Sequence, residues 1–197
     1  MTDRSGGADD TNSIIFIAHV KECLEQAKKK CLALGLKPTS RTIVVSIARQ
    51  LLGFYQDDVL IKSYVVSTSL RPPSNVKDSL GTPRGLHEIA EKIGAGTPPG
   101  IVFKARVGLG KHFSELDDDL QAKNLITARI LWLSGLEPGV NSGGTVDTHA
   151  RYIYIHGTNH ADRLGQPSTS GCVHMSDLEI IELFEQVRTR DQVWIED

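Results

Sequence analysis

One cysteine and one upstream histidine are the residues of this chain whose types and spacing suggest chemistry. His156 and Gly157 end an apolar run that reads as a strand, and Cys172 follows 16 positions after the histidine in a Ser-Gly-Cys turn. A thiol at neutral pH needs a base or a positive environment to become a nucleophile, and a histidine within reach supplies the base. The pair predicts thiolate nucleophilic catalysis, with the intervening loop folding back to bring the two side chains together.

The residues around Cys172 favour a reactive thiol. Gly171 lets the backbone approach a substrate closely, and the amides near Cys172 could form an oxyanion hole. We expect a helix to begin directly after the turn, where the positive end of its dipole would stabilise a thiolate. The alternative for a lone cysteine is an inert packed residue, and on the residues alone that alternative stays open.

A zinc site is the competing interpretation of the same stretch. His156, His160, Cys172 and His174 are four side chains that zinc accepts as ligands, within 19 positions. His156 and His160 would share a face only on a helix, whereas this segment reads as the end of a strand. Neither a CxxC nor an HExxH pattern supports the metal, so the spacing favours nucleophilic catalysis.

The bulk properties fit one globular domain with or without a helical extension, in a chain of 197 residues with a formal net charge of -2. This charge gives no reason to expect nucleic acid or a membrane surface as partner. Cys23, Cys31 and Cys172 form a poor disulfide framework and suggest free thiols in a reducing compartment. The apolar run 14–18 is too short for an export signal or a membrane span. We therefore expect a cytoplasmic protein, or one of the periplasm or cell wall if the true N-terminus differs.

The elements that must position the pair are mostly strands. Strands are expected over residues 43–48, 51–55, 59–67, 101–107, 126–134, 151–156 and 192–195, while 86–93 fits a strand or a helix. The first three should form a β-meander, and the polar segment between 107 and 126 should be a loop. Ser176 with Glu179 three positions later is a capping box that predicts a helix through Val187.

The N-terminal part of the chain differs from the rest. Residues 1–12 are polar and predicted to be a disordered tail. Residues 13–42 are predicted to hold an amphipathic helix, from about 14 to 34, and a linker. The catalytic domain is then expected over 43–197, and the whole chain is expected to be mainly β (α+β).

From residue 43 onward the chain resembles the catalytic domain of the L,D-transpeptidases, the YkuD-type family. The resemblance rests on three features: the strand motifs IVVSIA, QLLGFY and YVVSTS, the turn TPRG at 82–85, and HGT at 156–158 followed by TSGCVHM around Cys172. It implies a β-sandwich or barrel with a helix after the catalytic cysteine, to which an N-terminal amphipathic helix is added.

The resemblance also implies an activity and roles for residues. Such enzymes are cysteine acyltransferases that cleave the bond between the third residue, usually meso-diaminopimelate, and the terminal D-alanine of peptidoglycan stem tetrapeptides. Cys172 would be the nucleophile, His156 the general base, and the Gly157 carbonyl the group that orients the imidazole. The amides of Gly171 and Cys172 become candidates for the oxyanion site. No cofactor is implied, and carbapenem-type inhibitors are expected to acylate Cys172.

Two positions depart from the family's usual motif. Ser170 stands where a histidine normally precedes the Gly-Cys pair, and His174 stands where an arginine is usual. Ser170 could donate a hydrogen bond in place of the imidazole, whereas His174 could recognise a carboxylate only when protonated. His149 is a further candidate to line the cleft, and Arg84 is a candidate anchor for a substrate carboxylate.

The acyl acceptor stays open at this point. Water would make the chain an L,D-carboxypeptidase of murein recycling, and the side-chain amine of another stem would make it an L,D-transpeptidase that forms 3-3 cross-links. The absence of a visible export signal favours the first. A non-catalytic wall-binding module is the remaining alternative, and it would need neither His156 nor Cys172.

Overall fold

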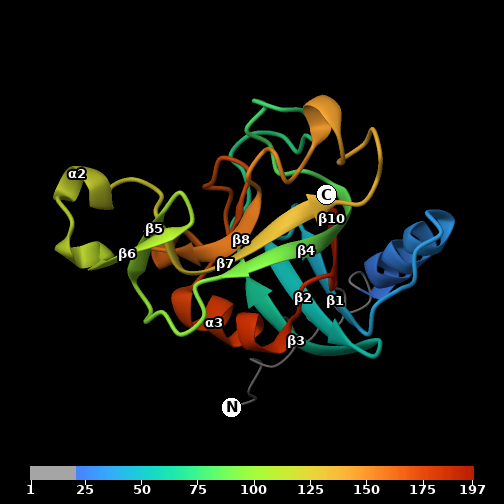
Figure 1. Cartoon of the computed structure of the whole chain (residues 1–197), viewed down its shortest axis with the longest axis horizontal. Helices are drawn as coiled ribbons and strands as arrows, with labels where there is room; N and C mark the ends of the chain where they lie inside the picture. The colour runs from blue at the N-terminus through green and yellow to red at the C-terminus, as the bar shows by residue number, and fades with distance from the viewer. Residues whose placement is uncertain (1–20) are drawn as a thin grey trace, which may run out of the picture.

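The computed structural model describes residues 21–197, which are organised around one strongly curved sheet (Figure 1). Its strands are β1 (Arg41–Ser46), β2 (Leu51–Gln56), β3 (Val59–Val65), β4 (Gly85–Ile93), β5 (Ile101–Lys104), β6 (Val107–His112), β7 (Ile126–Gly135), β8 (Tyr154–Thr158), β9 (Val173–Met175) and β10 (Gln192–Glu196). The strand order is β3-β2-β1-β10-β4-β7-β5-β6, with β8 beside β7 and β9 beside β8. The expected mainly β architecture is confirmed, as is the β-meander of β1, β2 and β3.

The helices are few and mostly short. They are η1 (Phe113–Glu115), α2 (Asp118–Gln121), η2 (Gly144–Val146), η3 (Ala161–Arg163), α3 (Asp177–Gln186) and a helix over residues 21–33. In this part of the chain no helix has the length and apolar character needed to cross a membrane.

Helix α3 packs on the concave face of the sheet and forms the main core there. Ile180, Leu183 and Phe184 are buried among side chains from β1, β2, β4, β7, β8 and β10. The helix begins where the sequence predicts, because the Ser176 hydroxyl accepts from the Glu179 amide at 3.4 Å. This N-cap fixes the segment that follows the cysteine turn.

The helix over residues 21–33 covers the other face of the sheet. Figure 1 shows it in blue, on the far side of β1 and β2 from α3. Cys23, Leu24, Ala27 and Cys31 are buried on it, against apolar side chains that include Val44, Tyr55, Leu86 and Trp194. The helix accounts for part of the predicted range 14–34. Residues 14–20 and the predicted tail 1–12 lie outside the described residues.

Two strands near the site were not expected from the sequence. The predicted strand 101–107 ends at Lys104, turns at Ala105 and Arg106, and returns as β6 inside the segment expected to be a loop. The three-residue strand β9 lies between the cysteine turn and α3, so the predicted helix follows the turn a few residues later, after the cap at Ser176. β6 is largely exposed and contains two glycines, and β9 is too short to show a period, so neither shows a strand pattern.

Candidate active site

Strand alternation and pairing gather the predicted catalytic residues on one face. Tyr154, His156 and Thr158 alternate along β8 toward the face opposite α3. The parallel pairing of β8 with β9 puts His174 directly opposite His156, and Cys172, two residues earlier, beside Tyr154. The 15 residues between His156 and Cys172 therefore form a connection that returns the chain to the same sheet edge.

The Cys172 thiol is half-buried and bonded to backbone groups of the neighbouring strand. Its Sγ accepts from the Tyr154 amide at 3.4 Å and donates to the Tyr152 carbonyl at 3.5 Å. Burial raises the pKa of the Cys172 thiol to about 11, against the opposing influence of the Tyr154 amide and the positive charge of Arg151. The resting thiol is protonated at neutral pH, so attack requires a base.

His156 is the buried imidazole on the same face, with a relative exposure of 3%. Its Nδ1 lies 2.7 Å from the Gly157 carbonyl oxygen, which only accepts, so Nδ1 carries the proton and Nε2 is left as the basic nitrogen. Burial lowers the pKa of His156 to about 4. At neutral pH the pair is a thiol and a neutral imidazole, and no hydrogen bond joins the two side chains.

His174 supports the His156 ring. The two ring centroids lie 4.5 Å apart with an interplanar angle of 59°. Burial, with the neighbouring imidazoles of His156 and His160, lowers the pKa of His174 to about 2. His174 could bind a carboxylate as a cation only if it were protonated. Because it is buried and neutral, it does not provide that positive charge.

Gly157 is a glycine because α3 begins against it. Its backbone faces the concave side, where an added Cβ would collide with the Asp177 carboxylate and the Thr127 carbonyl oxygen. Asp177 is the first residue of α3, and its carboxylate also accepts from the Thr127 hydroxyl and the Gly100 amide. The residue whose carbonyl orients His156 is thus held between β7 and α3.

The turn before Cys172 is braced by a buried threonine. The Thr169 hydroxyl donates to the Cys172 carbonyl at 2.7 Å and accepts from the Gly171 amide at 3.2 Å. Gly171 adopts a φ of +123°, a conformation that side chains rarely take. The Gly171 amide is already engaged, whereas the Cys172 amide has no hydrogen-bond partner within residues 21–197.

Arg151 holds a second loop beside the thiol. Its guanidinium donates to the Ser74 carbonyl at 3.0 Å, the Gly81 carbonyl at 2.7 Å and the Ser79 hydroxyl at 3.4 Å. A pocket of about 370 Å³ opens there, lined by Lys77, Asp78, Leu80, Ala150, Arg151, Tyr152, Ile153 and Ser170. The exposed Ser170 thus lies at a pocket wall next to the catalytic turn.

An aromatic cluster forms the other side of the site. Cys172 packs against a buried group made of Phe103, Ile130, Trp132 and Tyr154. His149 stacks on the Trp132 ring at a centroid distance of 3.9 Å and an interplanar angle of 5°. His149, which was predicted to line the cleft, therefore contacts Trp132, and Trp132 belongs to the cluster against which Cys172 packs.

Arg84 lies apart from this group. Its Nη1 donates to Asp197 Oδ2 at 2.8 Å, and it lines a different pocket together with Lys30, Glu137 and Trp194. The structure thus brings together the other predicted residues, and does not bring Arg84 to the thiol. No three His, Cys, Asp or Glu side chains in the described part of the chain converge to hold a metal ion.

Comparison with known protein families gives one match that covers most of the chain. The family model of YkuD, the L,D-transpeptidase catalytic domain, matches residues 40–195. A comparison with curated protein sequences gives no match.

Several solved structures are similar to the chain. An L,D-transpeptidase in complex with imipenem is 14% identical, with a TM-score of 0.49, and the match covers 80% of this chain and 59% of that one. An L,D-transpeptidase from Mycobacterium smegmatis is 16% identical, with a TM-score of 0.47 and coverages of 82% and 61%. L,D-transpeptidase 3 from Mycobacterium tuberculosis, in complex with a faropenem-derived adduct, is 14% identical, with a TM-score of 0.49 and coverages of 82% and 62%.

This chain therefore spans about 60% of the length of these structures. The family assignment comes from the model that matches residues 40–195, which is most of the chain. The chain belongs to the YkuD family of L,D-transpeptidase catalytic domains and is a cysteine enzyme of that family.

Proposed function

We propose that the chain cleaves the L,D peptide bond between the third residue and the terminal D-alanine of peptidoglycan stem tetrapeptides, and that water resolves the resulting thioester. The observation that supports the proposal is the shared face of β8 and β9, which carries the Cys172 thiol next to Tyr154 and a neutral, oriented His156 two residues farther along β8. This arrangement is the nucleophile and base of acyl transfer, with a carbonyl in the orienting role.

In the first half of the reaction, Cys172 Sγ attacks the carbonyl carbon of the third residue while His156 Nε2 takes the thiol proton. The Cys172 amide stabilises the oxyanion of the tetrahedral intermediate. The intermediate then breaks the carbon–nitrogen bond, and D-alanine leaves with the proton from His156. A thioester on Cys172 remains.

In the second half, His156 Nε2 takes a proton from water as the water oxygen attacks the thioester carbonyl. The carbon–sulfur bond breaks, a tripeptide with a free carboxyl group leaves, and the proton returns to Cys172. Water as acceptor requires only access to the thioester, because the same base activates it. The product pair is that of an L,D-carboxypeptidase in murein recycling.

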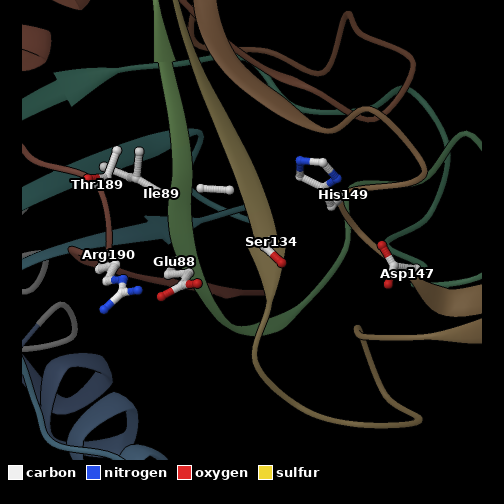
Figure 2. A pocket seen from close by; sticks show the side chains of 8 residues that line it. Glu88, Ile89, Ser134, Asp147, His149, Thr189 and Arg190 are labelled. Atoms are coloured by element: carbon white, nitrogen blue, oxygen red, sulfur yellow. The ribbon is translucent and has the colours of Figure 1, made fainter.

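Transfer to the amine of another stem is the second candidate. Beyond the His149–Trp132 stack lies a pocket of about 480 Å³, lined by Glu88, Ile89, Ala90, Ser134, Asp147, His149, Thr189 and Arg190 (Figure 2). Figure 2 shows Glu88 and Ser134 on neighbouring strands, with His149 and Asp147 on one side and Arg190 on the other. Glu88 and Asp147 give this pocket two carboxylates against the one guanidinium of Arg190, and this net negative charge would attract an ammonium group, which is the acceptor in a 3-3 cross-link.

The test is mass spectrometry of the purified protein with a disaccharide tetrapeptide, with and without an added acceptor stem. Tripeptide and free D-alanine as the main products support the carboxypeptidase, and a cross-linked dimer supports the second candidate. Cys172→Ala should abolish either product. Unchanged substrate with the folded wild type, or equal turnover by Cys172→Ala, contradicts both candidates.

A carbapenem gives an independent measure of the thiol. The similar structure named above was determined with imipenem, and we propose that imipenem acylates Cys172. The intact mass of the wild type should rise by one adduct, and that of Cys172→Ala should not change. Cys23 and Cys31 are buried, with exposures of 1% and 0%, and should stay unmodified.

A further inference from the structure

The turn of the β5–β6 hairpin places an arginine over the aromatic side of the site. Lys104 pairs with Val107, so Ala105 and Arg106 form a two-residue turn, with φ of +47° and +69°. Such turns favour Asn and Gly, because other residues are strained at positive φ. The turn is therefore poorly optimised for folding, and this points to a use for the Arg106 side chain.

The guanidinium of Arg106 is held by rings. Its Cζ lies 4.7 Å from the centroid of Trp132 and 5.2 Å from that of Tyr152, and Nη1 donates to the Tyr154 hydroxyl at 3.3 Å. Cation–π contacts orient an arginine without consuming its N–H donors. Most of the donors of Arg106 are thus left to bind another group.

Arg106 is a cation without a partner anion close by. It takes part in none of the ion pairs within residues 21–197. The Glu91 carboxylate acts on it only from farther away and lies 3.5 Å from His149 Nε2. A half-exposed guanidinium with free donors is suited to a bidentate carboxylate.

Arg151 and His174, two other basic side chains near the thiol, are committed or neutral. Arg151 donates to two backbone carbonyls and a hydroxyl of the loop beside the thiol. His174 is buried and uncharged. Arg106 is the guanidinium that stays available on the aromatic cluster against which Cys172 packs.

We propose that Arg106 is a specificity-determining residue that binds a carboxylate of the peptide whose carbonyl Cys172 attacks. The inference rests on the proposed function, because it concerns the same peptide. Tyr154 connects the two groups, since its amide donates to Cys172 Sγ and its hydroxyl accepts from Arg106. The bound carboxylate therefore lies on the aromatic side of the thiol and is that of either the terminal D-alanine or the third residue's side chain.

The test compares Arg106→Gln with four forms of the tetrapeptide. These are the free acid, the D-alanine amide, the amide of the third residue's side chain, and the doubly amidated peptide. We expect Arg106→Gln to lower kcat/KM for the free acid about tenfold or more, since a charged hydrogen-bonded pair is lost. The difference between wild type and variant should vanish for the doubly amidated peptide and for the single amide that removes the bound carboxylate.

Lys104→Gln is the matched control. It removes one positive charge from the same hairpin, while alternation along β5 directs Lys104 away from the cluster to which Phe103 belongs. Equal losses for Arg106→Gln on all four peptides, or equal losses in both variants, overturn the proposal. Arg106→Lys should recover part of the activity.

A second measurement does not depend on the peptide. Wild type, Arg106→Gln and Lys104→Gln are alkylated at Cys172 with iodoacetate and, separately, with neutral iodoacetamide, and the rates are followed by mass spectrometry. We expect the iodoacetate-to-iodoacetamide rate ratio to fall several-fold only in Arg106→Gln, because the guanidinium no longer attracts the carboxylate. A ratio that is the same in all three proteins overturns the carboxylate site, even if the wild type cleaves no tetrapeptide. Failure of the proposed function would appear as absent turnover with this ratio difference intact.

Discussion

Cys172 and His156 are both buried enough that each favours its uncharged form. Burial raises the pKa of the thiol to about 11 and lowers that of the imidazole to about 4, so the resting pair is not an ion pair. In the proposed mechanism the base is therefore present at neutral pH, and the thiolate would form as the proton moves to His156 Nε2 during attack. This order separates the site from cysteine enzymes that hold a preformed thiolate.

The pH profile of acylation should show the lowered pKa of His156. Because the pKa of His156 is lowered, its basic form persists below the usual value of about 6.5 and is lost only as the pH falls through about 4. The rate constant for acylation by imipenem should therefore have its acid limb near pH 4. Circular dichroism at each pH is the control for folding, and an acid limb at about 6.5 in folded protein would contradict the prediction.

Gly157→Ala should harm both the fold and the site. The added Cβ collides with the Asp177 carboxylate and the Thr127 carbonyl, so β8 must move away from α3. We expect a loss of about 1–3 kcal/mol in the free energy of unfolding, as for other overpacked positions, and slower acylation because the His156 acceptor shifts.

Gly108→Ala is the control for this prediction. A Cβ at Gly108 meets only the Phe103 ring, at 3.6 Å, which is an ordinary contact. Urea unfolding of both variants measures the difference. Equal stability of Gly157→Ala and Gly108→Ala would show that the α3 contact does not require a glycine.

At the scale of elements, the site depends on the parallel pair β8–β9 and on the β5–β6 hairpin. The pair aligns His156 with His174 and brings Cys172 to Tyr154. The hairpin covers the aromatic cluster and presents Arg106 at its turn. Both elements are short, and packing on β7 and α3 holds them in place, because so few residues cannot be stable alone.

Ala105→Asn should stabilise the hairpin. Asn tolerates the positive φ of the first turn position better than Ala, so we expect a gain of about 0.5–1 kcal/mol in the free energy of unfolding. Urea unfolding measures it, and acylation by imipenem should stay unchanged because Arg106 is kept. A loss of stability would show that the turn is not limited by backbone strain.

At the scale of the whole molecule, three histidines within residues 21–197 are buried without charge. Burial lowers the pKa of His87 and His156 to about 4 and that of His174 to about 2. In the unfolded chain each titrates near 6.5, so between about pH 6.5 and 4 the unfolded state binds protons that the folded state excludes. The free energy of unfolding should fall as the pH falls through this window and should not depend on these groups above it.

The slope of the free energy of unfolding against pH tests whether these three buried histidines exclude protons. Each histidine contributes up to about 1.4 kcal/mol per pH unit within the window. His87 lies on β4 and is held by the Gly85 carbonyl and the Thr148 hydroxyl, so His87→Gln removes one titrating group and leaves the residues of β8 and β9 unchanged. Urea unfolding between pH 5 and 7 should show a slope reduced by about one third. An unchanged slope would show that His87 does not exclude protons in the folded state.

The residues by themselves predicted the fold class, the meander and the cap at Ser176, and they supplied Cys172 and His156 as the proposed catalytic pair. Each of these follows from local information, such as periodicity, a capping pattern or a motif that one short stretch contains. The protonation state of His174 could not be predicted from local sequence. Its neutrality comes from burial opposite His156, which depends on a three-residue strand without a period of its own.

The tertiary structure alone decided which cations reach the thiol. Arg84, Arg106 and Arg151 look alike in the sequence, since each is a charged residue near a turn or loop. Packing pairs Arg84 with Asp197, commits Arg151 to loop carbonyls and places Arg106 over Trp132 and Tyr152. The sequence gives the positions of the charged residues along the chain. Contacts with residues distant in sequence determine whether each charge is paired with an anion, bonded to the backbone or free to bind a ligand.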